Sequence, residues 1–121
     1  MIRSFRDLLV YQKAFANSLE VHKISQSFPH YEQYELACQI RRATKSIAMN
    51  IAEGYGRNES LAEFRRFLTI ALGSCDEVKV QLDYCKALAY ITDEQYRLLE
   101  GEYVEISKML VSMIKTRKHF Q

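Results

Sequence analysis

A two-glycine segment separates the two longest periodic stretches of this chain: Asn50-Ile51-Ala52-Glu53-Gly54-Tyr55-Gly56-Arg57. Gly54 and Gly56 suit the left-handed backbone conformations that end a helix, where a residue with a Cβ atom would be strained. Apolar residues recur with helical spacing from about Tyr31 to Gly54, and they do so again from Leu61 onward. The segment therefore indicates a turn between two long helices.

The expected helix before this turn has one polar residue on its apolar face. Asn50 has two interpretations. It sets the register of the bundle, with its amide satisfied by a neighbouring helix, or it contacts a ligand in a pocket. The two heptad rows of this helix are Leu36, Ala43 and Asn50 on one side and Ile40, Ile47 and Gly54 on the other.

Two capping boxes mark the starts of the next two helices. In Ser60-Leu61-Ala62-Glu63 and in Thr92-Asp93-Glu94-Gln95, a hydroxyl and an acidic or amide side chain each satisfy a backbone N–H at the helix start. The first of these helices is expected to be about 28 residues long, with the turn before the second near Tyr90 to Thr92. Their core rows are Leu61, Leu68, Cys75, Leu82 and Ala89 with Phe64, Ala71, Val78 and Cys85, and then Tyr96, Leu99, Tyr103, Ile106, Leu110, Met113 and Arg117.

A shorter helix is expected at the start of the chain, from about Asp7 to Gln26. Ser4 and Asp7 suggest a cap, and Phe28-Pro29-His30 interrupts the pattern because proline disfavours helical geometry in the residue before it. The spacing predicts a core face made of Leu8, Tyr11, Phe15, Leu19 and His22.

Four amphipathic helices with short connections predict an all-α fold, an antiparallel up-down-up-down four-helix bundle that forms one domain over residues 1–121. No segment alternates with a period of two, so strands are not expected. A long coiled-coil dimer is the alternative, and the turn signals argue against it.

The composition is that of a globular protein with one core, at 48% apolar residues and a mean hydropathy of -0.26. No apolar run reaches the ~18 residues that a membrane helix needs, and residues 1–10 lack the apolar core of a signal peptide. We expect a cytoplasmic protein without a membrane partner.

No arrangement of residues indicates a catalytic, cofactor or metal site. The three cysteines, Cys38, Cys75 and Cys85, form no CxxC motif, and no His/Cys pair has zinc-site spacing. We interpret Cys75 and Cys85 as buried, inert thiols. Glu53 is interpreted as a salt-bridge partner of Arg65 or Arg66 rather than as a general base, since no companion acid, nucleophile or metal ligand accompanies it.

Antiparallel packing predicts that one end of the bundle collects basic residues. Such an end attracts phosphate backbones or an acidic protein, or it is a solvated surface that is paired internally; both interpretations stay open. Four acidic residues, Asp7, Glu53, Glu59 and Glu63, are expected beside eight basic ones, Arg3, Arg6, Arg57, Arg65, Arg66, Lys115, Arg117 and Lys118.

Two further groups are predicted from the helix pairing. Phe67, Ile70 and Tyr84 give the third helix a second apolar flank, which is either an intersubunit contact or part of a broad internal stripe. The same pairing sets Arg41 and Arg42 beside Ser74 and Glu77, and together with Asn50 and Glu53 these residues make a structural polar cluster: Arg41, Arg42, Asn50, Glu53, Ser74 and Glu77.

Several motifs carry a resemblance to a known family: Phe5-Arg6-Asp7-Leu8, Gln39-Ile40-Arg41-Arg42-Ala43, the two-glycine segment and Ile70-Ala71-Leu72-Gly73-Ser74. The chain resembles the 23S rRNA intervening-sequence proteins over nearly its whole length. In one place it departs from the family, because Ser46-Ile47-Ala48-Met49-Asn50 lacks a proline that the family often has, which predicts a straighter helix. The family-pattern residues are Arg41, Arg42, Asn50, Glu53, Gly54, Gly56, Arg57, Arg66, Gly73, Ser74 and Glu77.

The resemblance implies an antiparallel four-helix bundle that assembles into a homopentamer and has no established reaction. It also implies a relation to the accessory variability protein of diversity-generating retroelements, which binds a reverse transcriptase and nucleic acid. The sequence therefore favours a non-enzymatic homo-oligomeric scaffold. The alternative is an accessory protein that binds RNA or DNA, in partnership with a reverse transcriptase, through the basic end.

Overall fold

The structure is a computed structural model, and it describes residues 1–116. Over those residues it is all-α, with four long helices and two short 3-10 turns, as predicted. The elements are η1 (Phe5–Asp7), α1 (Leu9–Ser25), η2 (His30–Glu32), α2 (Leu36–Gly56), α3 (Leu61–Ala87) and α4 (Asp93–Thr116).

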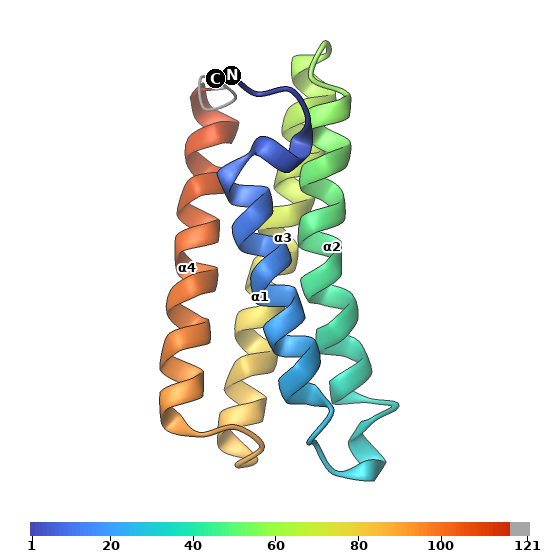
Figure 1. Ribbon diagram of the computed structural model, residues 1–121, viewed down its shortest axis with the longest axis vertical. Coiled ribbons are helices and arrows are strands. Elements are labelled where there is room, and N and C mark those ends of the chain that lie inside the picture. The colour runs from blue at the N-terminus through green and yellow to red at the C-terminus, as the bar shows by residue number, and fades with distance from the viewer. Residues whose placement is uncertain (117–121) are drawn as a thin grey trace.

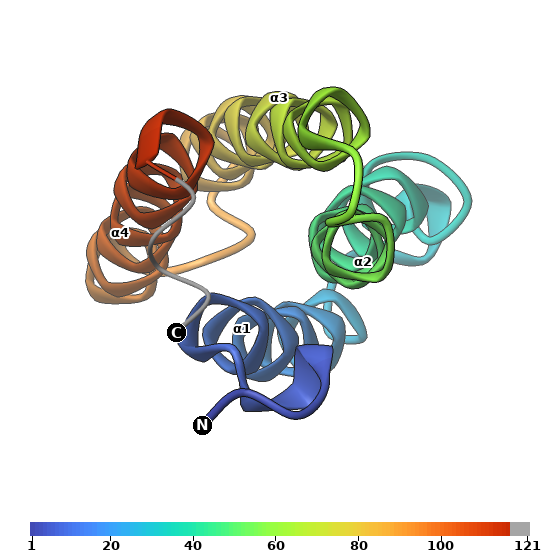
Figure 2. The same ribbon diagram turned by 90° about the horizontal axis from the view of Figure 1, so that it is seen from above.

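The four helices form the predicted up-down-up-down bundle (Figure 1). Seen from above, α1, α2, α3 and α4 follow one another around the bundle axis (Figure 2). The most extensive helix contact joins α2 and α3, while α1 and α4, which close the ring, share the least contact of the adjacent pairs. The antiparallel order gathers the start of α1, the end of α2, the start of α3 and the end of α4 at one end.

The apolar rows predicted for the last three helices form most of the core. Leu61 and Ala89 are the exceptions on α3, because Leu61 is 37% exposed and Ala89 follows the end of the helix. The hydrophobic side chains with 0–1% exposure on these helices are Ala37, Ile40, Ile47, Ile51, Phe64, Leu68, Ala71, Cys75, Val78, Leu82, Cys85, Tyr103, Ile106 and Leu110.

The predicted core face of α1 is confirmed for Leu8, which is 2% exposed, and is wrong for Phe15 and Leu19. Phe15 is 47% exposed and Leu19 is 55% exposed, whereas the buried stripe is made of smaller side chains. Both stripes have helical spacing, and the one with small residues lets α1 approach its neighbours closely. The buried serines are no obstacle, since Ser18 Oγ donates to Phe15 O at 2.7 Å and Ser25 Oγ donates to His22 O at 2.7 Å. The α1 residues that face the core are Val10, Ala14, Ser18, Val21 and Ser25.

The glycine turn also differs from its prediction. No glycine within residues 1–116 has a positive φ, and α2 continues as one helix through Gly56. Gly54 is buried, and a Cβ atom there would lie 3.3 Å from Phe67 Cβ and 3.4 Å from Phe64 O. Gly54 therefore serves the close approach of α2 and α3 rather than a left-handed cap.

A left-handed residue does occur, at the turn between α3 and α4. Ala89 has φ 61°, the N–H of Tyr90 donates to Cys85 O at 2.8 Å, and the N–H of Ala89 donates to Lys86 O at 3.0 Å. These two bonds make a Schellman motif, in which glycine is the usual left-handed residue. Ala89 thus holds a position that costs a residue with a Cβ atom about 1 kcal/mol.

The helix starts follow the predicted caps with small shifts. Thr92 and Gln95 exchange both bonds of a capping box, at 2.9 and 3.0 Å, before α4. Ser60 Oγ accepts from the N–H of Glu63 at 3.2 Å before α3, but the other half of the predicted box is wrong: the N–H of Ser60 donates to Arg57 O at 3.1 Å, and the Glu63 carboxylate accepts from Arg66. The Ser4 box caps the short turn η1 rather than α1, and η2 occupies the expected first turn of the second helix.

Candidate functional site

The structure brings six of the eight predicted basic residues to one end of the bundle. Arg3 and Arg6 lie near the chain start, Arg57 follows α2, and Lys115 lies in the last turn of α4 (Figure 1). Arg65 and Arg66 lie in the first turns of α3. Arg117 and Lys118 lie outside the described residues.

Two of these arginines are paired with carboxylates at the surface. Arg57 Nε lies 3.2 Å from Glu53 Oε2, and Arg66 Nε lies 2.9 Å from Glu63 Oε2. The hydrogen bond from Arg66 lowers the pKa of the Glu63 carboxyl, and the same bond raises the pKa of Arg66. Arg65 instead donates from Nε to the backbone oxygen of Ile114 at 3.0 Å, which ties α3 to α4.

Aromatic rings contact three of the arginines at this end of the bundle. The guanidinium carbon of Arg66 lies 4.3 Å from the centroid of the Phe67 ring, and that of Arg57 lies 5.3 Å from it. Arg6 lies 4.5 Å from the centroid of Phe5. Such contacts hold a planar cation against the protein surface, so this end is organised as well as basic.

Glu53 is a salt-bridge partner, as predicted, but its partner is Arg57 rather than Arg65 or Arg66. The reason is that α2 extends to Gly56, so that Arg57 lies one helical turn beyond Glu53. Arg66 likewise takes its partner, Glu63, from its own helix.

The predicted polar cluster does not form as a whole: Glu53 pairs with Arg57, and the other five residues divide into two separate groups. Arg41 does not lie beside Ser74 or Glu77, because its side chain turns to the other side of α2. Its Nε donates to Ser25 Oγ at 2.7 Å and its NH2 group donates to Gln33 Oε1 at 2.6 Å. Arg41 therefore fastens α2 to the end of α1 and to the connection between them.

The second group lies in a groove between α2 and α3, where Arg42, Ser74 and Glu77 come together as predicted. Asn50 is half-buried and bonds within its own helix rather than with a neighbouring one. Its Nδ2 donates to Ser46 O at 2.8 Å and to Ser46 Oγ at 3.1 Å. Ser46 Oγ in turn lies 3.1 Å from Ser74 Oγ, which makes the contact across to α3.

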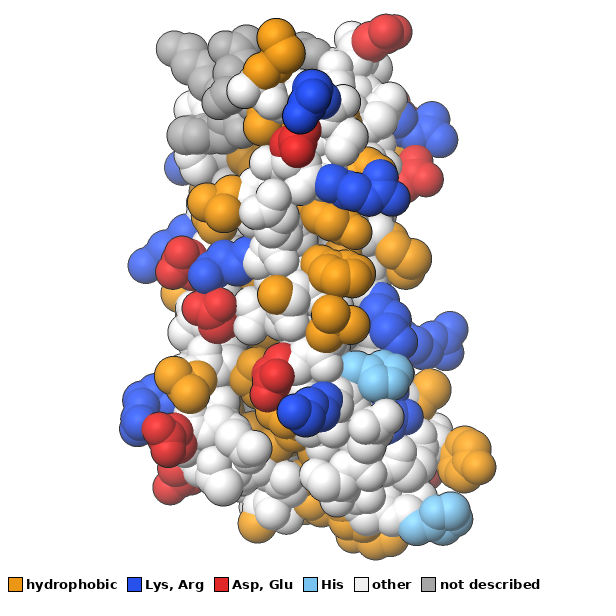
Figure 3. All heavy atoms as spheres, in the orientation of Figure 1, with side chains coloured by type: hydrophobic (Ala, Val, Ile, Leu, Met, Phe, Trp, Pro, Cys, Tyr) orange, Lys and Arg blue, Asp and Glu red, His pale blue; other side chains and the backbone are white. Residues whose placement is uncertain are grey.

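An apolar groove of about 370 Å³ lies between α1 and α2. Phe15 and Leu19 form its α1 wall, and Met49, 61% exposed, forms part of its α2 wall. Hydrophobic side chains gather along the α1–α2 side of this face (Figure 3). The sequence prediction missed the groove because it assigned Phe15 and Leu19 to the core; the small residues of the opposite stripe were the signal for the true orientation.

A second exposed apolar surface runs along α3. Ile70 is 41% exposed, Val80 54% and Tyr84 59%. The predicted second flank of this helix thus exists for Ile70 and Tyr84, while Phe67 is half-buried beside Gly54. We refer to Ile70, Val80 and Tyr84 as the α3 row.

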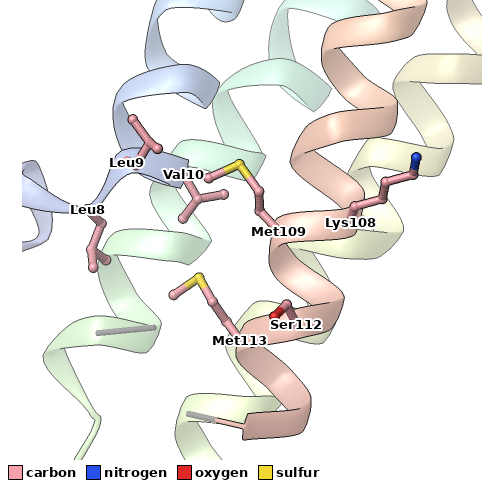
Figure 4. Close-up of a pocket in the computed structure, with 7 residues that line it drawn as sticks. All are labelled: Leu8, Leu9, Val10, Lys108, Met109, Ser112 and Met113. Carbon is pink, nitrogen blue, oxygen red and sulfur yellow. The ribbon is translucent and has the colours of Figure 1, made fainter. Parts of the chain in front are cut away.

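A third hollow, of about 410 Å³, lies where the start of α1 meets the end of α4. Met109 and Met113 extend from α4 towards Leu8 and Val10, whereas Lys108 points away from them (Figure 4). The hollow marks the loose packing between α1 and α4 and offers no chemically distinctive group.

The two buried thiols are inert. Cys75 and Cys85 are fully buried, as predicted, and burial raises the pKa of each to about 11. Both thiols are therefore protonated at neutral pH. Within residues 1–116, no three His, Cys, Asp or Glu side chains are grouped to hold a metal ion.

No helix in the described part of the chain is long and apolar enough to cross a membrane.

Comparison with known proteins gives a family but no activity. A crystal structure of a protein of unknown function from the S23 ribosomal protein family of Bacteroides thetaiotaomicron VPI-5482 superposes with a TM-score of 0.82. It is 30% identical over 89% of this chain and 96% of that one. No curated protein matches the chain. The family model for the 23S rRNA-intervening sequence protein matches residues 6–112, and the chain therefore belongs to that family.

Proposed function

We propose that this protein is a non-enzymatic scaffold built from identical subunits, held together where the apolar groove of one copy receives the α3 row of the next. The observation that carries the proposal is the exposure of Phe15, Leu19 and Met49 along a groove of about 370 Å³. A monomer seldom leaves contiguous apolar side chains of this size in water.

The two apolar surfaces suit a head-to-tail contact. One is a groove between α1 and α2, and the other is a row on α3, a helix that lies across the bundle from α1 (Figure 2). A contact between unlike surfaces generates a closed ring when the rotation between subunits closes. The family resemblance suggests five subunits, and the three cysteines, none in a disulfide, suit the reducing cytoplasm.

Light scattering after size-exclusion chromatography tests this proposal. The chain mass is 14.2 kDa, so we expect a wild-type particle several times that mass. Leu19→Asp, which places a charge in the groove, is expected to reduce the particle to a monomer with its helical circular dichroism intact. Leu98→Asp is the matched control, because Leu98 is 61% exposed on α4, outside both apolar surfaces. A monomeric wild type would overturn the proposal.

A second candidate function is binding of RNA or DNA by the basic end, as an accessory to a reverse transcriptase. The supporting observation is that Arg3, Arg6 and Lys115 form no salt bridge with any residue among 1–116, in contrast to Arg57 and Arg66. Cations without carboxylate partners are the ones that neutralise phosphates at the lowest cost.

A salt titration against single-stranded RNA and duplex DNA tests the second candidate. We expect the slope of log affinity against log salt to fall by roughly 0.7 to 0.9 for each phosphate contact that is removed. The variant combines Arg3→Ala, Arg6→Ala and Lys115→Ala, the three cations without a carboxylate partner among residues 1–116. Nucleic-acid binding by this variant equal to that of the wild type would exclude the basic end, and a reverse transcriptase recovered with the native protein would support it.

A further inference from the structure

We propose that the groove between α2 and α3 binds a phosphoryl group, held by Arg42 and Lys45 together with the hydroxyls of Ser46 and Ser74. This groove measures about 420 Å³ and lies away from the basic end, beside the middle of α2. Five of its seven lining residues are polar or charged, and the side chains of Lys45 and Met49 also line the apolar groove on the α1 side.

The cations of this groove lie on one face of α2. Arg42 and Lys45 are three residues apart, which is the spacing of neighbours on a helix surface. Arg42 is exposed and has no salt bridge or hydrogen bond with another described residue, whereas Arg57 and Arg66 at the basic end each hold a carboxylate. An unpaired guanidinium presents its donors in the fork that matches two phosphate oxygens.

Lys45 lies on α2, as Arg42 does, at the edge of the groove that faces α1. Its Nζ lies 3.3 Å from His22 Nδ1 on α1, and Lys45 forms no salt bridge with a carboxylate among residues 1–116. The ammonium group therefore has two further N–H donors for a ligand.

The hydroxyl pair supplies one more donor. Ser46 Oγ and Ser74 Oγ lie 3.1 Å apart, and the bond between them uses one of their two hydrogens. The Asn50 amide donates to Ser46 Oγ at 3.1 Å and therefore uses none. One hydroxyl hydrogen of the pair remains available to an anion, and the amide fixes the orientation of the pair.

Glu77 is the one acidic side chain in the lining of this groove. Its Oε2 accepts from Gln81 Nε2 at 3.3 Å, which draws the carboxylate along α3, and it makes no salt bridge with Arg42. Glu77 opposes an anion by screened repulsion, so removing its charge should strengthen binding rather than weaken it. This opposite sign distinguishes a phosphate site from a surface ion pair.

Equilibrium dialysis of the full chain against labelled inorganic phosphate tests the site. We expect saturable retention of one phosphate per chain. Arg42→Ala is expected to weaken retention roughly tenfold and Ser74→Ala a few fold, in keeping with the loss of a charged and of a neutral hydrogen bond. Glu77→Gln is expected to strengthen it, and the matched control Arg97→Ala, an exposed arginine on α4, to leave it unchanged.

A fluorescent oligothymidine identifies the source of the phosphoryl group. Displacement of bound phosphate by the oligomer, lost in Arg42→Ala, assigns the site to a nucleic-acid backbone; no displacement assigns it to free phosphate. Retention without saturation, or equal losses in Arg42→Ala and Arg97→Ala, would overturn the proposal. Particle mass is measured in parallel, so failure of this site is distinguished from failure of self-assembly.

Discussion

The α2–α3 pair and helix α1 pack in opposite ways. Between α2 and α3, large side chains such as Ile47 and Leu68 are fully buried, and Gly54 lets the two backbones approach closely. Helix α1 buries Ala14 and serines instead and leaves Phe15 in water. The difference indicates that α2 and α3 stabilise the subunit, and in the proposed assembly the large apolar residues of α1 make a contact outside it.

The seam between α1 and α4 strengthens this contrast. It is held by a polar network, in which Lys13 Nζ lies 3.1 Å from Glu102 Oε1 and Asn17 Nδ2 donates to the same oxygen at 3.1 Å. Solvent-exposed ion pairs such as that of Lys13 and Glu102 contribute about 0–1 kcal/mol to stability. The seam is thus the weakest joint of the bundle.

The largest effect is expected where α3 packs in the core. Leu68→Ala removes a fully buried side chain and should lower the free energy of unfolding by about 2–5 kcal/mol. Leu98→Ala, at 61% exposure, is the matched change and should stay within about 0.5 kcal/mol. Urea unfolding followed by circular dichroism measures both, and equal losses would contradict the contrast.

A smaller loss is expected at the closest approach of α2 and α3. Gly54→Val introduces atoms where a Cβ alone would already lie 3.3 Å from Phe67 Cβ, and overpacking of this kind costs about 1–3 kcal/mol. Gly56→Val is the control, since a Cβ at Gly56 meets nothing within 4 Å. If Gly56→Val were the more destabilising of the two, Gly54 would have no special packing role.

A gain is expected at the turn between α3 and α4. Ala89→Gly relieves the left-handed φ of 61° and should raise the free energy of unfolding by about 0.5–1 kcal/mol. Ala16→Gly, at an exposed position inside α1, is the opposite case and should lower it by about 1 kcal/mol. The thermal midpoints of the two variants should therefore move in opposite directions.

The smallest effect is expected at the α1–α4 seam. The hydrogen bond from Asn17, followed by that from Lys13, lowers the pKa of the Glu102 carboxyl. A lowered pKa contributes stability above the unfolded value of about 4.5, and that stability is lost as pH falls through the folded value. Since the Glu102 side chain is 40% exposed, we expect less than about 1 kcal/mol. Glu102→Gln should remove this part of the loss of stability at low pH. If the free energy of unfolding of this variant depended on pH as that of the wild type does, the network would contribute nothing to stability.

The sequence predicted the fold of the subunit better than it predicted which side chains lie at the surface. Rows such as Phe64, Ala71 and Val78 have one strong apolar face, so their burial follows from spacing alone. Helix α1 has two faces with helical spacing, and the prediction chose the larger side chains, which subunit assembly rather than folding would bury. Gly54 was assigned to a turn because a glycine at a close helix contact has the same local signature as a C-cap.

The sequence predicted which residues gather at the basic end, but not which of them are paired. Antiparallel topology brought the basic residues to one end, as expected, but which arginines are paired depends on side-chain geometry that spacing does not contain. Arg41 and Arg42 are adjacent in sequence, and they leave α2 on opposite sides because consecutive helical residues are about 100° apart. The apolar groove needed the orientation of α1, which only the packing supplies.

The most direct test of head-to-tail assembly mixes two variants, each defective in one surface. Leu19→Asp places a charge in the groove and leaves the α3 row intact. Tyr84→Asp places a charge in the α3 row and leaves the groove intact. Each should be monomeric alone, at 14.2 kDa, and the equimolar mixture should form a heterodimer of twice that mass by native mass spectrometry and no larger particle. Monomers that stay monomeric when mixed, or a Tyr84→Asp variant that assembles alone, would contradict the account.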